Sequence, residues 1–130
     1  DPARVYADGI SNGGGMAFAL SCTLSDRIAA VGMVAPALFL PWRWCPDPRP
    51  VPIMVFHGTD DRTTPYHGGP SWVSRGRNFQ GIPRWVADGA RKNGCAPDPI
   101  ESRVSAEVTR RAYTRCDDAV RGEEAGCGRF

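Results

Sequence analysis

The sequence lacks the features that mark several large classes of protein. None of its apolar runs approaches the ~20 residues that a membrane-spanning helix needs, and no internal repeat is visible. A net charge of +2 in 130 residues is too small to indicate binding to nucleic acid or to an anionic membrane surface. We therefore expect neither partner for this chain.

The five cysteines include no Cys-x-x-Cys pair, so the sequence gives little support to a zinc site. Five is nevertheless a high number for a cytosolic enzyme, which favours disulfides. The local pairing of Cys22 with Cys45 and of Cys95 with Cys116 would close two loops of about 20 residues, each worth roughly 3 kcal/mol. Any four cysteines can pair in three ways. Buried free thiols are a further alternative, and Cys127 would be left over.

The order of the apolar segments predicts an α/β fold. Apolar residues make up 42% of the sequence, enough for one domain with a hydrophobic core. We expect strands at 4–10, 28–35 and 51–58, helices at 16–24 and 79–93, irregular loops at 36–50 and 97–105, an exposed, flexible segment at 67–78, and an edge strand at 107–114. This order is that of a mostly parallel sheet with crossover helices.

The apolar pattern also predicts which side chains are buried. The continuous apolar run 28–35 is typical of a strand buried on both faces. In the first helix, Met16, Leu20 and Leu24 fall four residues apart on one face. The apolar face of the second helix holds Ile82, Trp85, Val86 and Ala90, and Gly94 is its expected stop.

One serine lies at the apex of a tight, glycine-rich turn. The stretch Gly9-Ile10-Ser11-Asn12-Gly13 has the form of the Gly-x-Ser-x-Gly nucleophile elbow, in which a strand runs into a helix. Glycines two before and two after the serine keep Cβ atoms out of the turn. The Asn12 amide and the helix N-terminus would then face a developing oxyanion. The alternative is a glycine-rich turn with an incidental serine.

A carboxylate follows the third expected strand at the same edge of the sheet. Ligands bind at the carboxyl ends of parallel strands, and both Ser11 and the pair Asp60 and Asp61 fall there. Asp61 suits the acid that orients a catalytic imidazole, with Asp60 as its competitor. A turn residue that caps its own loop is the alternative for each.

Histidine is scarce, and this weakens the predicted site. His57 precedes the acid and ends a strand, which favours a structural role. His67 follows the acid in the right order, but only six residues later, before any further strand. We therefore expect the catalytic histidine to lie outside this chain.

Several blocks together resemble one family. They are Asp1-Pro2-Ala3-Arg4-Val5-Tyr6 with Gly9-Ile10-Ser11-Asn12-Gly13-Gly14, Leu24-Ser25-Asp26-Arg27-Ile28-Ala29-Ala30-Val31, Pro50-Val51-Pro52-Ile53 with His57-Gly58-Thr59-Asp60-Asp61 and Pro65-Tyr66, Arg84-Trp85, Asn93-Gly94-Cys95, and Tyr113-Thr114-Arg115-Cys116. In these blocks the chain resembles the secreted esterases of the polyhydroxybutyrate depolymerase and feruloyl esterase type, which are α/β-hydrolases.

The resemblance implies roles for particular residues. It makes Ser11 the nucleophile, Asp61 the triad acid and Asn12 an oxyanion-hole amide, and it pairs Cys95 with Cys116. It also implies a secreted, extracellular or periplasmic, enzyme that cleaves esters of hydroxyalkanoates or of hydroxycinnamates on plant polysaccharide. We expect no cofactor and no metal, and the sequence leaves the oligomeric state open.

The chain departs from the family in three places. Gly15 stands where a bulkier residue is usual, which would loosen the first helical turn. A Gly-Gly-His-x-Trp-Pro segment should follow Cys116, but 117–130 does not resemble it. The third departure is that the N-terminal half of the family's sheet is missing. We therefore interpret 1–116 as a partial α/β-hydrolase domain holding the C-terminal half of the sheet, and 117–130 as a non-matching tail that a frameshift or truncation would explain.

Two loop tryptophans are candidates for contact with the substrate. Trp42 and Trp44 could line an acyl or aromatic subsite, although loop tryptophans more often anchor packing.

The alternative to an esterase is a non-catalytic, truncated domain or a remnant that binds polymer or carbohydrate. Without a base, a serine hydroxyl is a weak nucleophile, so we expect the isolated chain to be impaired.

Overall fold

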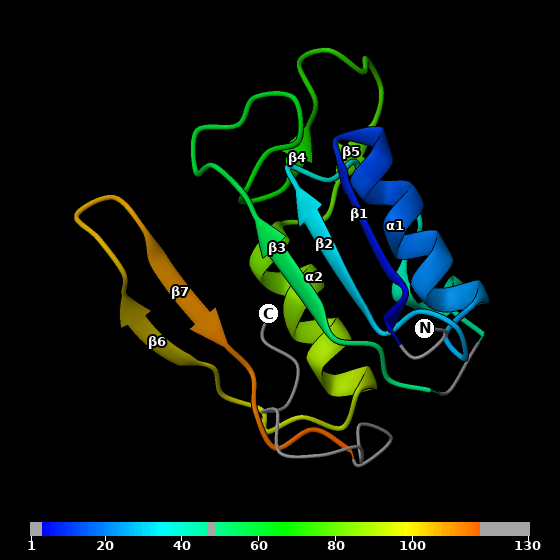
Figure 1. Ribbon diagram of the computed structural model, residues 1–130. Coiled ribbons are helices and arrows are strands. Elements are labelled where there is room, and N and C mark those ends of the chain that lie inside the picture. The colour runs from blue at the N-terminus through cyan, green and yellow to red at the C-terminus, as the bar shows by residue number, and fades with distance from the viewer. Residues whose placement is uncertain (1–3, 47–48, 118–130) are drawn as a thin grey trace.

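The computed structural model describes residues 4–46 and 49–117 (Figure 1). Its elements are, in chain order, β1 (Tyr6–Ile10), α1 (Asn12–Thr23), β2 (Ala30–Val34), the 3-10 turn η2 (Trp42–Trp44), β3 (Ile53–Phe56), β4 (Gly69–Pro70), β5 (Asn78–Phe79), α2 (Ile82–Lys92), β6 (Ile100–Arg103) and β7 (Thr109–Ala112). No helix in the described ranges is long and apolar enough to cross a membrane.

A three-stranded parallel sheet forms the centre of the structure. Its order is β1-β2-β3, with Ile10 opposite Val34 and Val34 opposite Phe56, so all three strands end at one edge. The strands of this sheet and the helices α1 and α2 lie close to their expected positions. The β1-α1-β2 unit has the parallel strands and connecting helix that the sequence predicts.

Both helices pack on the same face of this sheet. Buried residues of α1, α2, β2 and β3 join in one core, with Phe18 of α1 and Trp85 of α2 at ring centroids 5.0 Å apart. Figure 1 shows α2 behind β2 and β3. Val31, Met33 and Ile53 are the strand residues buried beneath the two helices.

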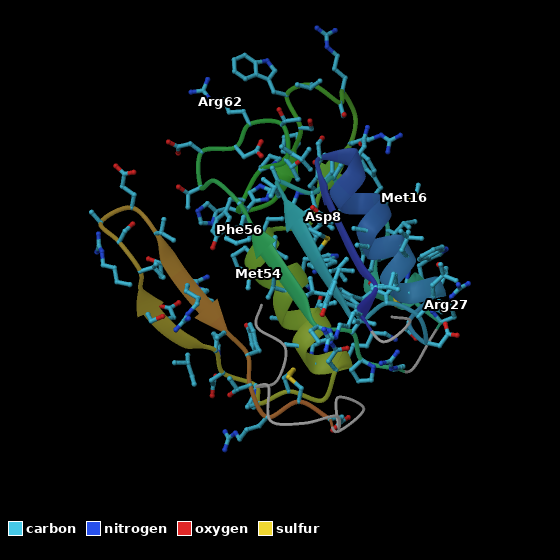
Figure 2. All side chains as sticks on the ribbon, in the orientation of Figure 1. Asp8, Met16, Arg27, Met54, Phe56 and Arg62 are labelled. Carbon is cyan, nitrogen blue, oxygen red and sulfur yellow. A yellow bond between two sulfur atoms is a disulfide. The ribbon has the colours of Figure 1, made fainter. Side chains whose placement is uncertain are left out.

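The opposite face of the sheet is open and largely apolar. The residues that point there alternate with the buried ones, and the exposed large side chains among them are Tyr6, Ile10, Val34, Met54 and Phe56. Figure 2 labels Met54 and Phe56 on β3 and Asp8 on β1. The expectation that 28–35 is buried on both faces is therefore wrong for β2, because no described element covers this side.

The prediction for the buried face of α1 is also wrong. Met16 is 61% exposed and Leu24 is exposed, whereas Ala17, Phe18 and Cys22 are buried. The helix carries apolar residues almost all round, so their spacing does not single out one face. The aromatic contact of Phe18 and the Cys22 bridge fix its orientation instead. In α2, by contrast, all four predicted residues are buried.

The C-terminal strand does not extend the parallel sheet. β7 forms within the expected 107–114, but it pairs antiparallel with β6, which lies in the expected loop 97–105. Figure 1 shows this hairpin projecting beside β3. Within 67–78, the segment expected to be exposed, β4 and β5 pair antiparallel through Gly69 with Phe79 and Pro70 with Asn78, and Ser71 is buried.

Two disulfides join the elements. Cys22 at the end of α1 bonds to Cys45 after η2, and Cys95 after α2 bonds to Cys116 after β7. The local pairing is thereby confirmed over the other pairings and over free thiols. Cys127 and nearly all of the tail lie outside the described residues.

Candidate active site

Ser11 lies between β1 and α1 in a backbone conformation that few residues other than glycine adopt. Its φ is 53° and its ψ is −119°. Such a conformation costs on the order of 1–3 kcal/mol and persists only where the surroundings hold it. Ser11 N donates to Val34 O at 2.9 Å, and Ser11 O accepts from Gly15 N at 3.1 Å and Ala37 N at 2.9 Å. These bonds hold the turn in this conformation.

The glycines around Ser11 have different reasons to be glycine. A Cβ on Gly9 would collide with the backbone of Gly13, so the strand and the helix can approach this closely only if residue 9 is glycine. A Cβ on Gly13 would meet nothing within 4 Å. The expectation that both glycines keep Cβ atoms out of the turn is therefore correct for Gly9 and wrong for Gly13, whose backbone, rather than its Cβ, is the crowded part.

Gly15 has a packing reason to be glycine, whereas its effect on the first helical turn stays a prediction. A Cβ there would collide with the carbonyl oxygen of Ala37, so Gly15 allows the loop after β2 to approach α1. On the same side, a Cβ on Gly14 would lie 2.8 Å from Pro36 Cβ. The glycine run thus seats this loop against the elbow.

Asn12 is exposed and is the first residue of α1. Its N–H is one of the four that an α-helix leaves without an intrahelical acceptor, and the helix N-terminus adds a partial positive charge. The backbone at this position therefore offers what an oxyanion needs. Its role in an oxyanion hole stays a prediction.

Asp61 is fixed by its own loop after β3. Its Oδ1 accepts from Thr63 N at 2.8 Å and from Thr64 N at 2.9 Å, while Oδ2 lies 3.4 Å from His57 Nε2. The side chain is 18% exposed. Asp61 therefore caps its own turn through Oδ1, while Oδ2 faces His57 at the start of the same loop. The carboxylate of Asp60 is exposed and makes no hydrogen bond to the described residues.

The two histidines are placed differently from a catalytic base. The side chain of His57 is only 2% exposed, and its Nε2 lies 2.8 Å from Thr64 O, to which it donates. His57 Nδ1 is buried without a hydrogen-bond partner among the described residues. His67 is exposed and its ring lies edge-on to Tyr66. Within the described ranges neither ring hydrogen-bonds the Ser11 hydroxyl, and the structural interpretation of His57 agrees with its burial.

Ser11 and Asp61 share the carboxyl edge of the sheet but not a direct contact. Ser11 directly follows β1, and Asp61 lies five residues after the end of β3. Since β2 lies between them, the strand ends are about two strand spacings, roughly 10 Å, apart.

The two tryptophans of the predicted subsite lie in different environments. Trp42 packs with Phe18 and Trp85 at 4.8 Å to each ring and donates from Nε1 to Trp85 O at 2.8 Å. Its ring also occupies the space beside Gly89, where a Cβ would collide with it. Trp42 therefore has the packing role that the sequence left as the alternative. Trp44 is partly exposed and stays a prediction as a substrate contact.

Sequence reasoning missed the loop that follows β2. Ala35 has a φ of 42°, Pro36 is buried against Gly14, and Ala37 donates to Ser11 O. No motif marks these residues, because their contribution is made by backbone atoms. In residues 4–46 and 49–117, no three His, Cys, Asp or Glu side chains gather in a way that could hold a metal ion.

Comparison with known proteins finds sequence similarity to one enzyme. No family model matches the chain. Feruloyl esterase B of Piromyces equi is 39% identical to it over 110 residues, which cover 78% of this chain and 20% of the relative. The chain thus spans about a fifth of the length of the curated relative it matches. The similarity supports a feruloyl-esterase-like relationship for this chain.

Proposed function

We propose that this chain carries the nucleophile and the acid of a serine carboxylic-ester hydrolase, with Ser11 and Asp61 in these roles. The observation that carries the proposal is the positive φ of Ser11 at the junction of β1 and α1. The similarity to a protein named feruloyl esterase supports the ester as the bond that is cleaved.

In the proposed reaction, Ser11 Oγ attacks the ester carbonyl carbon and gives its proton to a histidine. The oxyanion accepts a hydrogen bond from the Asn12 N–H, at the N-terminus of α1. The carbon–oxygen bond to the leaving alcohol then breaks, and the alcohol takes the proton from the imidazolium. Water repeats the sequence on the acyl-enzyme and releases the acid. Asp61 would hold the imidazole in the required tautomer.

The proposed substrates are esters on biological polymers, of the hydroxycinnamoyl-polysaccharide or polyhydroxyalkanoate type. The name of the relative favours the first. Two disulfides support folding in an oxidising compartment and therefore a secreted protein.

The proposed fold is that of an α/β-hydrolase, with 1–116 as part of its catalytic domain and 117–130 as a non-matching tail. The parallel sheet and its open apolar face support this, because doubly wound sheets are covered on both faces.

A second candidate is a non-catalytic domain, and the placement of the histidines favours it for the isolated chain. His57 is engaged with Thr64 O, and His67 stands against Tyr66. An enzyme that loses one triad member keeps only about 10³- to 10⁴-fold catalysis over water. We therefore propose that these 130 residues alone are an impaired esterase.

Supplying the base from solution tests the proposal. The chain and its Ser11→Ala variant are compared in the turnover of p-nitrophenyl acetate and methyl ferulate, with increasing imidazole. We expect turnover above the imidazole background in the parent chain alone, rising with imidazole. Ser105→Ala, at an exposed serine between β6 and β7, is the matched control and should behave as the parent. Equal rates for the parent and Ser11→Ala at every concentration would remove the esterase assignment.

A further inference from the structure

An exposed aromatic side chain projects from the loop between β3 and α2. Trp72 is 70% exposed and the neighbouring Val73 is 73% exposed, whereas Trp85 is fully buried and Trp42 packs against it. Large aromatic side chains contribute most of their stabilisation when buried. An indole this far from the core therefore contributes little to folding and is available for binding.

One face of the Trp72 ring is already occupied by a cation. The guanidinium carbon of Arg62 lies 5.3 Å from the ring centroid, and Trp72 N donates to Arg62 O at 3.1 Å. The backbone bond and the cation–π contact hold the indole in position across the loop. The ring is thereby ordered while most of its surface stays open to a ligand.

After Asp60 and Asp61, the rest of this loop carries arginines and no acidic residue. From position 62 to position 87 the sequence contains Arg62, Arg75, Arg77 and Arg84 and no aspartate or glutamate. Arg62, Arg75 and Arg77 are exposed, and no carboxylate pairs with them within the described ranges. Arg77 lies over the half-exposed ring of Phe39 at 4.7 Å, and Phe39 contacts Phe79 at 5.3 Å. The two cation–π pairs are neighbours, because Ser71, next to Trp72, donates from its backbone N–H to Arg77 O at 3.1 Å.

This surface adjoins both candidate catalytic residues. Arg62 directly follows Asp61, and Phe39 lies two residues after Ala37, whose N–H holds the backbone of Ser11. Figure 2 shows Arg62 beyond the carboxyl end of β3. A polymer lying on this surface would pass beside the proposed site of ester cleavage.

We propose that Phe39, Arg62, Trp72, Arg75 and Arg77, here called the Trp72 surface, bind a polysaccharide that carries uronate carboxylates. The open indole face suits stacking on the apolar face of a sugar ring, and planar guanidinium groups pair with carboxylates in two-pronged geometry. The inference rests on the proposed function in one respect, since it names the polymer that carries the ester. The net charge of +2 is too low to favour nucleic acid as the occupant.

Binding is measured with the full chain carrying Ser11→Ala, by titration calorimetry against glucuronoxylan and against the same polymer after chemical reduction of its carboxyl groups. We expect about tenfold tighter binding to the acidic polymer, as one or two charge-assisted contacts would give. Arg75→Gln with Arg77→Gln should remove this preference. Trp72→Ala should weaken binding to both polymers about tenfold.

A matched control uses the same residue type elsewhere. Arg84→Gln removes an exposed arginine on α2 and should bind both polymers as the parent does. Equal affinity for the two polymers, or unchanged binding by Trp72→Ala, would overturn the proposal. Binding of single-stranded DNA as tightly as glucuronoxylan would show a general polyanion site and would also overturn it.

Turnover separates this proposal from the esterase assignment. Trp72→Ala should hydrolyse p-nitrophenyl acetate in imidazole as the parent does, because that small ester does not reach the Trp72 surface. Polymer binding without any Ser11-dependent turnover would refute the esterase and leave the Trp72 surface standing. Turnover without a preference for the acidic polymer would do the reverse.

Discussion

His57 and Asp61 approach each other across one turn at the end of β3, with His57 Nε2 3.4 Å from Asp61 Oδ2. The stronger bond of His57 is the one to Thr64 O, at 2.8 Å. Asp61 Oδ1 accepts from the N–H groups of Thr63 and Thr64. The loop is thus closed from both ends, and the carboxylate is positioned by backbone atoms rather than by a partner on another element.

This arrangement predicts different effects for two substitutions of Asp61. Asp61→Ala removes the acceptor of two backbone N–H groups and should lower the free energy of unfolding by about 1–2 kcal/mol. Asp61→Asn keeps an acceptor oxygen and should lose less than half as much. Urea unfolding followed by tryptophan fluorescence measures both. Equal losses in the two variants would show that the negative charge, rather than the turn, is what matters.

Removal of the two histidines should affect stability to very different extents. His57→Ala leaves Thr64 O without its donor and opens a hole at a side chain that is 2% exposed, so it should cost about 2–4 kcal/mol. His67→Ala, at an exposed ring, should stay within about 0.5 kcal/mol of the parent. The same unfolding measurement applies. A tolerated His57→Ala would contradict a structural role for this residue.

The glycines of the elbow provide the sharpest local test. Gly9→Ala places a Cβ against the Gly13 backbone and should cost at least about 2 kcal/mol, because the strand and the helix must separate. In Gly13→Ala the added Cβ meets no atom within 4 Å, and alanine favours the helix. The substitution should therefore be neutral or stabilising by up to about 1 kcal/mol. Thermal unfolding of the two variants decides the matter. If Gly9→Ala is as stable as the parent, the backbones of Gly9 and Gly13 must lie farther apart than in this structure.

The strand-to-helix turn at Ser11 and the strands β1, β2 and β3 could be predicted because their signals are local. A glycine two residues before a serine at a strand-to-helix turn reports a close backbone approach, and Gly9 shows that approach. The face of α2 could be predicted because apolar and charged residues are separated around it. In α1 they are not, and the burial of Phe18 is decided by contact with Trp85, which lies 67 residues away in the sequence.

What could not be predicted depends on pairing across the chain. The alternation in 107–114 indicates a strand, but it says nothing about the partner, which is β6 rather than β3. In the candidate site, Ser11 and Asp61 carry motifs, whereas Ala37 acts through its backbone N–H and has no side-chain signal. The open sheet face was missed because an apolar run predicts burial without saying which element supplies the cover.

The orientation of α1 yields a prediction of its own. Phe18→Ala removes a fully buried ring that contacts both Trp42 and Trp85, and should cost about 3–5 kcal/mol. Met16→Ala, two residues earlier on the same helix and 61% exposed, should change stability by less than about 0.5 kcal/mol. Denaturant midpoints with unchanged slopes measure both. A larger loss for Met16→Ala than for Phe18→Ala would restore the face expected from the spacing of Met16, Leu20 and Leu24.

The two disulfides predict both a number of free thiols and a contribution to the free energy of unfolding. Two bridges use four of the five cysteines, so a thiol assay of the unfolded, unreduced chain should find one free thiol. Each bridge closes a loop of about 20 residues, so Cys22→Ser with Cys45→Ser should lower the free energy of unfolding by roughly 3 kcal/mol. The pair Cys95→Ser with Cys116→Ser is the matched comparison and should lose a similar amount. Its loss falls on the segment that ties β7 to the end of α2, so protection from hydrogen exchange should fall there first and remain in β1 to β3. Five free thiols in the parent chain would contradict both bridges.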